Sequence, residues 1–134
     1  MTTPLQPSPR EDFIGQHIVA AAIEVHRTFG GPGLLESLYE EALVWELRKR
    51  EFSVERQKPI AVRYKGVTLG EPLVLDVLVE NLVIVECKAT LHYHPIFEAQ
   101  TLTYLRVTGL KLGYVINFGE KLVKNGIRRV VNGL

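Results

Sequence analysis

The sequence predicts one α/β domain in which helices flank a single mixed central sheet. Its 134 residues are enough to bury a hydrophobic core and suit one domain. Apolar residues recur with the helical period up to residue 50 and again near residue 100, but with a period near two between residues 52 and 88. The predicted order is two helices, four strands, a helix and two strands, which is typical of mixed α/β domains.

The first helix is marked by its cap. Ser8 and Glu11 have the spacing of a capping box, and Pro9 suits the first helical position. An apolar stripe with the helical period follows, and Gly30 and Gly31 end it. The stripe consists of Phe13, Ile14, Ile18, Ala21, Ala22, Val25 and Phe29.

The second helix is expected over Leu34–Arg50, after the turn Gly31-Pro32-Gly33. Three consecutive cations near its end suit the negative end of the helix dipole. Its apolar face is predicted to consist of Leu35, Leu38, Tyr39, Ala42 and Leu43.

Strands are expected from Phe52 onward. Ser53–Tyr64 is predicted as one strand with a bulge near Pro59, and Val67–Leu69 returns after a turn at Lys65-Gly66.

A second hairpin is predicted in the most apolar part of the chain. Its strands are Leu73–Val79 and Leu82–Lys88, around a turn at Glu80-Asn81. Side chains alternate along a strand, so one face should point into a core. That face consists of Leu75, Val77, Val79, Val83, Val85 and Cys87.

The chain after the hairpin completes the sheet. A helix is predicted over Pro95–Thr108, stopped by Gly109, and a strand over Leu110–Asn117. The basic segment after Gly119 is expected to form a loop and a short edge strand.

The other face of the second hairpin carries Asp76, Glu86 and Lys88. The two acids are equidistant from Asn81, so they should face each other and repel. Mg²⁺ is commonly held by one or two carboxylates, waters and phosphate oxygens, and it would compensate this repulsion. The Cys87 carbonyl is a further candidate ligand, and Lys88 is placed to position an attacking water. This pattern indicates phosphodiester hydrolysis. A solvated face with Lys88 as a salt-bridge partner is the alternative.

Composition narrows the possible functions. The formal net charge is +1, so nucleic-acid binding would need a local basic patch or a metal. A single cysteine excludes an internal disulfide and a multi-cysteine zinc site. Without a signal peptide or an apolar run of about 20 residues, we expect a soluble, cytoplasmic protein with no membrane partner. Residues 1–10 are expected to be a flexible tail before a single domain over residues 11–134.

Three other residues are candidates for the same site. Glu36 lies in the first turn of the second helix, where the helix dipole alone also favours a carboxylate. Gln100 and Tyr104 are four residues apart on the third helix and therefore share a face. Taken singly, these two are more typical of the edge of a core.

Together these motifs resemble the GxxExxY proteins, small prokaryotic members of the PD-(D/E)XK nuclease superfamily. The signature here is Gly33-Leu34-Leu35-Glu36-Ser37-Leu38-Tyr39. The resemblance runs from about Phe13 to Asn132 and includes the Asp76 strand, Glu86-Cys87-Lys88, EAQTLTYL and VINFG. It implies a restriction-endonuclease-like core.

By position, the resemblance also implies roles for individual residues. Asp76 and Glu86 match the acids that bind Mg²⁺ or Mn²⁺, and Lys88 matches the catalytic lysine. Glu36 matches the helix-borne acid that supports the metal or its waters.

Nucleic-acid contacts are implied for the third helix and the basic tail. Gln100 and Tyr104 match the Q-x-x-x-Y element of RecB-like nucleases, which lies near the site and the DNA. From the tail, Arg128 and Arg129 are expected to bind the same partner.

Two positions depart from the family pattern. Cys87 replaces an aliphatic residue, and its side chain should face the core as a small hydrophobe. Phe97 stands where many members have histidine. His92 and His94 lie just upstream. The alternatives are that they substitute for this histidine or that they belong to the loop or the helix entry, and we favour the second.

The leading hypothesis is therefore a metal-dependent nuclease acting on nucleic acid, with DNA as the expected partner. The alternative is a non-catalytic nucleic-acid-binding or assembly subunit with the nuclease fold, as a homodimer or within a larger complex. A metal-dependent hydrolase of smaller phosphate esters ranks last, because GGPG lacks the lysine and Ser/Thr of a phosphate-binding loop.

Overall fold

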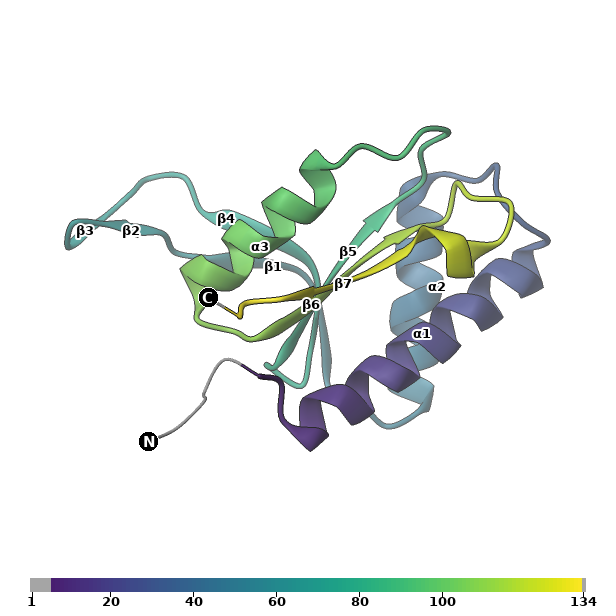
Figure 1. Ribbon diagram of the computed structural model, residues 1–134, viewed down its shortest axis with the longest axis horizontal. Coiled ribbons are helices and arrows are strands. Elements are labelled where there is room, and N and C mark those ends of the chain that lie inside the picture. The colour runs from purple at the N-terminus through teal and green to yellow at the C-terminus, as the bar shows by residue number, and fades with distance from the viewer. Residues whose placement is uncertain (1–5, 134) are drawn as a thin grey trace.

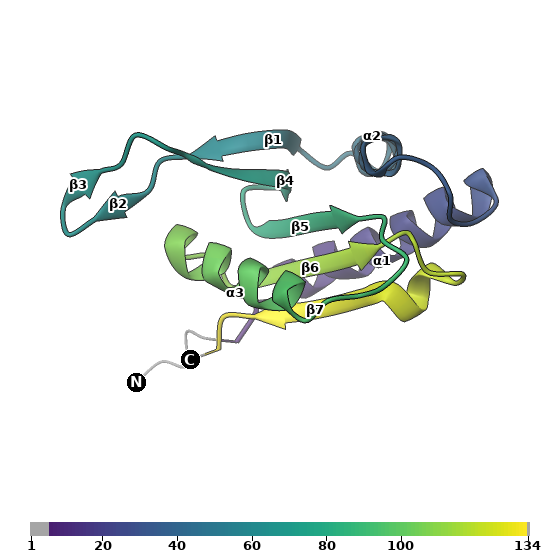
Figure 2. The same cartoon turned by 90° about the horizontal axis from the view of Figure 1, so that it is seen from above.

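The computed structural model describes residues 6–133. A five-stranded sheet in the order β1-β4-β5-β6-β7 lies between helices (Figure 1). Helices α1 (Pro9–Phe29) and α2 (Glu36–Lys49) pack on one face, and α3 (Ile96–Thr108) packs on the other (Figure 2). The predicted α/β domain with one mixed central sheet is confirmed.

The sheet is antiparallel except between β5 and β6, which are joined through α3. A parallel pair needs a long crossover of this kind. The strands of the sheet are β1 (Val54–Ile60), β4 (Leu73–Val79), β5 (Val83–Lys88), β6 (Leu112–Asn117) and β7 (Ile127–Val131). A 3₁₀ turn, η1 (Val123–Gly126), precedes β7. None of the helices formed by residues 6–133 has the length and hydrophobicity of a bilayer-spanning segment.

The first helix begins at the predicted cap. The Ser8 hydroxyl accepts the Glu11 N–H at 3.1 Å, and the Glu11 carboxylate accepts the Ser8 N–H at 2.7 Å. Pro9 and Arg10 are therefore helical, so the predicted boundary of the tail at residue 10 lies two residues too late. Residues 1–5 of that tail lie outside the described residues.

The prediction of one strand over Ser53–Tyr64 is wrong. Strand β1 pairs with β4 only as far as Ile60, which lies opposite Leu73, the first residue of β4. The chain beyond has no partner strand left in the sheet. It pairs with itself instead, as β2 (Arg63–Tyr64) and β3 (Val67–Thr68).

The apolar face of α2 differs from the predicted one by part of a turn. Leu35 and Leu38 are exposed, with 72% and 43% of their surface accessible. The residues of α2 that are buried against α1 and the sheet are Tyr39, Leu43, Val44 and Leu47.

The strand β4 changes face at Asp76. Leu75 was predicted to share a core face with Val77, but it packs with Leu78 in the core under α3. Gln57 lies opposite Asp76 in β1, has a φ of +51° and interrupts the β1–β4 pairing. A regular strand would keep residues i and i+2 on one face, so β4 departs from regular alternation at Asp76, opposite the distorted Gln57.

The end of β6 and the residue after it hold the loop that follows β5. The Asn117 side-chain oxygen accepts the N–H groups of Thr90 (2.9 Å) and Gly119 (3.0 Å). Its amide nitrogen donates to the Thr90 carbonyl at 3.1 Å. The Phe118 N–H donates to the Lys88 carbonyl at 2.7 Å. The chain is therefore held in place directly after Lys88.

Gly119→Ala is expected to destabilise the fold. A Cβ at Gly119 would lie 2.1 Å from the Thr90 carbonyl oxygen, so the backbone must move. We expect a loss of about 2 kcal/mol in the free energy of unfolding, measured in urea. Gly70→Ala is the control, because nothing lies within 4 Å of the Cβ position there. Equal losses in both variants would contradict the close approach.

Candidate active site

Asp76 and Glu86 face each other across β4 and β5, as predicted. The paired residues Val77–Val85, Leu78–Ile84 and Val79–Val83 place Asp76 opposite Glu86 when the register is continued. The Asp76 N–H donates to the Glu86 carboxylate at 3.1 Å. The Cys87 N–H donates to the Asp76 carboxylate at 2.9 Å. Each carboxylate thus accepts a backbone N–H from the neighbouring strand.

Burial makes this pair electrostatically unfavourable. Glu86 is only 4% exposed, and burial followed by the charge of Asp76 raises the pKa of Glu86 to about 8. Burial also raises the pKa of Asp76, against the opposing effect of the Cys87 N–H. The nearby Lys88 lowers both pKa values, but both stay above the ordinary values of these groups. The pair therefore lacks compensating positive charge.

Lys88 ends β5 beside the two acids. Its ammonium nitrogen lies 4.9 Å from the centroid of the Phe97 ring, at the start of α3. A cation over an aromatic face is attracted by the ring quadrupole. Phe97, at the position where the family often has histidine, thus contacts the lysine directly.

Helix α2 brings Glu36 to the same place. Although Glu36 is exposed as a residue, its carboxyl group is partly shielded, and this burial is the largest cause of its raised pKa. The charge of Asp76 raises this pKa further, whereas Lys88 and the Ala89 backbone N–H lower it. The sequence-predicted set of Asp76, Glu86, Lys88 and Glu36 is therefore brought together.

The tyrosine of the G-x-x-E-x-x-Y segment supports the loop before α2. Tyr39 is fully buried, and its hydroxyl donates to the Gly31 carbonyl at 2.7 Å. The same hydroxyl accepts the Leu34 N–H at 3.2 Å. Its ring stacks on Phe118 at 4.8 Å between centroids. Tyr39 thereby fixes the turn from which Glu36 enters the helix.

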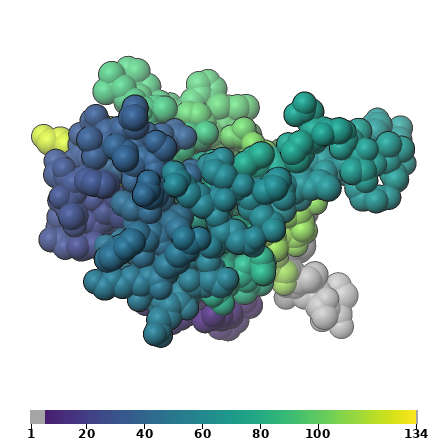
Figure 3. Space-filling model, turned by 180° about the vertical axis from the view of Figure 1, so that it is seen from behind, coloured from purple at the N-terminus to yellow at the C-terminus, as the bar shows by residue number. Residues whose placement is uncertain are grey.

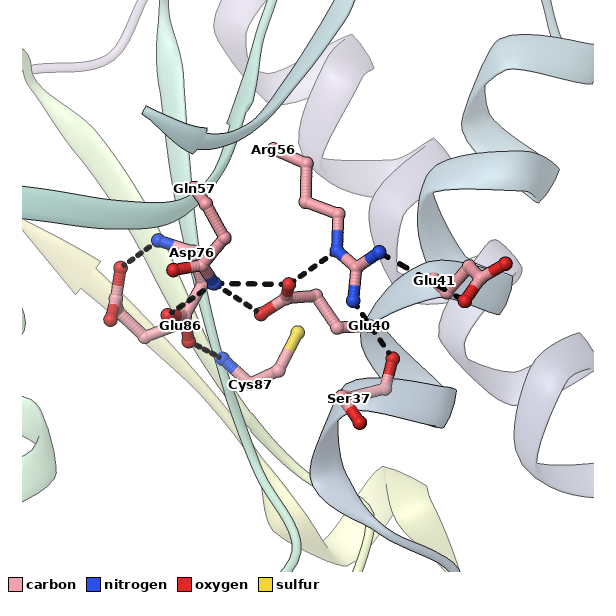
Figure 4. A network of polar contacts seen from close by, with 8 residues as sticks. All are labelled: Ser37, Glu40, Glu41, Arg56, Gln57, Asp76, Glu86 and Cys87. Carbon is pink, nitrogen blue, oxygen red and sulfur yellow. Dashed lines mark hydrogen bonds and ion pairs between the residues drawn. The ribbon is translucent and has the colours of Figure 1, made fainter. Parts of the chain in front are cut away.

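Three residues of this region were not identified from the sequence. Glu40 is 3% exposed, and its carboxylate accepts the Gln57 amide at 3.0 and 3.1 Å and the Arg56 guanidinium at 2.6 Å (Figure 4). Arg56 also donates to the Ser37 carbonyl at 3.1 Å. The same Gln57 amide lies 3.4 Å from an Asp76 carboxylate oxygen. Gln57 therefore links α2 to the site.

Of this network, only Glu40 has a spacing in the sequence that relates it to the site. Glu40 is four residues after Glu36, so the two acids share a face of α2. Gln57 had no such signal, because its approach to Asp76 depends on the β1–β4 register and on its positive φ.

Tyr104 lies on the site side of α3. Burial raises its pKa, and the charges of Glu86 and Asp76 raise it further, which places the phenol near both acids. Gln100 is half-buried one turn earlier on the same helix.

The structure separates Arg128 from Arg129. Arg128 lies 3.8 Å from the Glu98 carboxylate and 4.7 Å from the Tyr93 ring centroid, on the face covered by α3. Arg129 pairs with Asp12 of α1 at 2.8 Å, on the other face. Neighbouring residues of the edge strand β7 point in opposite directions, so the two arginines do not form one patch.

The two histidines of the β5–α3 loop make local contacts. The His94 ring nitrogen Nδ1 accepts the Ile96 N–H at 3.0 Å at the start of α3. The His92 carbonyl accepts the Thr90 hydroxyl at 3.0 Å. Both agree with the interpretation as residues of the loop and of the helix entry.

The donor set determines which metal the site could hold. Among residues 6–133, no three histidine, cysteine, aspartate or glutamate side chains form a preassembled metal cluster. Asp76 and Glu86 instead offer two carboxylates. The Cys87 N–H points at Asp76, and the N–H and C=O of a strand residue point to the same side, so its carbonyl faces Asp76 as well. So few protein oxygens suit a Mg²⁺ or Mn²⁺ ion that keeps several of its waters. They are too few to surround a cation with protein ligands alone.

One family model matches most of the chain. The family model described as the PD-(D/E)XK nuclease superfamily matches residues 12–130. Comparisons with curated proteins and with solved structures gave no significant match.

Proposed function

Because the chain belongs to the PD-(D/E)XK nuclease superfamily, we propose that it is a metal-dependent nuclease that hydrolyses phosphodiester bonds. The observation that carries this proposal is the Asp76–Glu86 pair, in which Glu86 is buried, Asp76 is half-buried and both pKa values stay raised although Lys88 lies nearby. If Lys88 were only a salt-bridge partner, one acid would be enough, and the second opposed acid would have no role.

The protein residues have distinct proposed roles. Asp76, Glu86 and the Cys87 carbonyl would hold Mg²⁺ or Mn²⁺, with Glu36 binding its waters. A bound divalent cation supplies Lewis acidity and neutralises charge on the phosphate. Lys88 orients the attacking water and stabilises negative charge on the phosphate oxygens. Phe97 keeps the Lys88 ammonium at the site.

Residues on α3 and β7 would bind the nucleic acid. Tyr104 and Gln100 lie on the helix next to the acids, and Arg128 lies on the same face of the sheet. Arg129 remains a weaker candidate because it is paired with Asp12 on the opposite face.

Gln57 is a positioning residue in this proposal. Its amide contacts both Glu40 and Asp76, so it ties the Asp76 carboxylate to α2. Gln57→Ala should weaken Mn²⁺ binding by roughly tenfold, as measured by calorimetry. Gln16→Ala, on α1, is the matched control. An unchanged Mn²⁺ affinity in Gln57→Ala would show that Asp76 needs no such support.

The function is tested with the unmodified protein. Mn²⁺ is titrated calorimetrically, and cleavage of mixed DNA and RNA substrates is measured with Mn²⁺, with Mg²⁺ and with a chelator. Metal-dependent cutting supports the nuclease. Metal binding without cutting of any substrate would favour the non-catalytic subunit, and no metal binding at all would contradict the proposal.

A further inference from the structure

A β-hairpin stands out from the body of the molecule. Residues 61–70, here called the arm, contain β2 and β3 joined by the turn at Lys65-Gly66. The arm extends beyond the sheet at the end where β1 leads into β4 (Figures 1 and 2). Seen from behind, it projects clear of the rounded body (Figure 3). No residue of the arm belongs to either hydrophobic core of the described chain.

The arm carries only positive charge. Its ten residues include Arg63 and Lys65 and no acid. Arg63 donates to the Gly66 carbonyl at 2.7 Å and approaches the Thr68 hydroxyl at 3.5 Å. The Lys65 ammonium lies 5.4 Å from the Tyr64 ring centroid. Within residues 6–133, neither cation forms an ion pair, whereas Arg56, Arg128 and Arg129 all do.

The arm also exposes apolar groups without a partner in the chain. Tyr64 is 60% exposed and Val67 62%, and Leu69 is exposed as well. A two-stranded hairpin in water is marginally stable unless a third strand, a helix or another molecule covers it. The combination of cations outside any ion pair and a largely exposed tyrosine suits an anionic partner with flat apolar groups.

We propose that the arm binds duplex DNA by lying in its major groove, an inference that rests on the proposed nuclease function. The major groove of B-form DNA admits a two-stranded β-ribbon, and Arg63 and Lys65 would face phosphates or guanine edges there. The deep, narrow major groove of A-form RNA excludes such a ribbon. A single strand has no groove to hold a ribbon, so the arm favours duplex DNA over duplex RNA and over single strands.

Chain connectivity places this surface near the site. Asp76 lies in β4, six residues after Gly70 at the end of the arm. Six residues in extended conformation span roughly 20 Å at most. The distance from the end of the arm to Asp76 is therefore no longer than about six base pairs of a duplex.

The test is DNA binding, measured apart from cleavage. Fluorescence anisotropy of a labelled 20-base-pair duplex of about two helical turns is followed in EDTA at several salt concentrations. The double variant Arg63→Glu and Lys65→Glu should bind at least about tenfold more weakly, and its salt slope should fall by roughly two.

The matched control is Lys49→Glu with Lys111→Glu. This control changes the net charge by the same amount as the arm variant. Lys49 is the last residue of α2, and Lys111 directly precedes β6, so both lie at the end of the sheet away from Glu36 and Lys88. The control should keep most of the affinity of the parent. Equal weakening in both double variants would overturn the proposal, because it would show an effect of net charge alone.

Two further readouts separate other partners. The arm variant should lose more affinity for duplex DNA than for duplex RNA or single-stranded DNA of the same sequence; equal losses would overturn groove binding. Light scattering should give parent and variant the same mass, whereas conversion of a dimer into a monomer would assign the arm to contacts between copies. A parent that binds DNA through the arm but cuts nothing would refute the nuclease and leave the arm proposal standing.

Discussion

Asp76→Asn is expected to abolish metal-dependent cleavage, lowering kcat/KM at least about 1,000-fold. Asparagine keeps the volume of the side chain and an oxygen that can accept the Cys87 N–H, so the hairpin should stay intact. It removes the charge that a divalent cation needs. Mn²⁺ binding, measured by calorimetry, should be lost together with cleavage.

The fold of the Asp76→Asn variant should be at least as stable as the parent without metal. The substitution removes a negative charge that raises the pKa of the buried Glu86. Asp12→Asn is the control, because it neutralises an acid that pairs with Arg129 on the opposite face of the sheet. An Asp76→Asn variant that cuts as fast as the parent would show that the site is elsewhere.

The metal-free protein should lose stability as the pH rises from about 5 to about 8. The pKa of Glu86 is about 8 when folded, against a reference value of 4.5, so the folded state binds more protons in this interval. The contribution of Glu86 to stability is therefore greatest below pH 4.5. It is lost as the pH rises through the pKa of Glu86 in the folded state. At about 1.4 kcal/mol per pKa unit, the loss amounts to a few kcal/mol, or roughly 10 °C in Tm.

Thermal unfolding in EDTA from pH 5 to 8 tests this expectation. Glu86→Gln has no charge to bury and still accepts the Asp76 N–H, so its Tm should vary much less over this range and exceed that of the parent at pH 8. Glu71→Gln, at an exposed position, should follow the parent. Added Mn²⁺ should restore the parent at pH 8. A parent whose Tm is unchanged over this range would contradict the burial of an uncompensated charge.

Local spacing was sufficient to predict most of the fold. The capping box at Ser8, the glycines that end the first and third helices and the turn centred on Asn81 are interactions over a few residues. The opposition of Asp76 and Glu86 follows from the same arithmetic, because residues equidistant from a hairpin turn must face each other.

Other features of the structure depend on contacts between residues far apart in the sequence, which local spacing could not predict. The separation of β2 and β3 from β1 depends on where β4 begins, some ten residues later in the chain. The acids that pair with Arg128 and Arg129, Glu98 of α3 and Asp12 of α1, depend on which helix covers each face of β7.

The sequence by itself therefore determined the superfamily, the acids that face each other, and the order of the elements apart from the division of Ser53–Tyr64 into β1 and β2. Only the tertiary structure decided that Gln57 links Glu40 to Asp76 and that Leu75 lies under α3. The physical reason is range. Caps, turns and strand alternation depend on neighbours a few residues apart, whereas these contacts depend on how α2 and β1 pack against β4 and on one left-handed residue, Gln57.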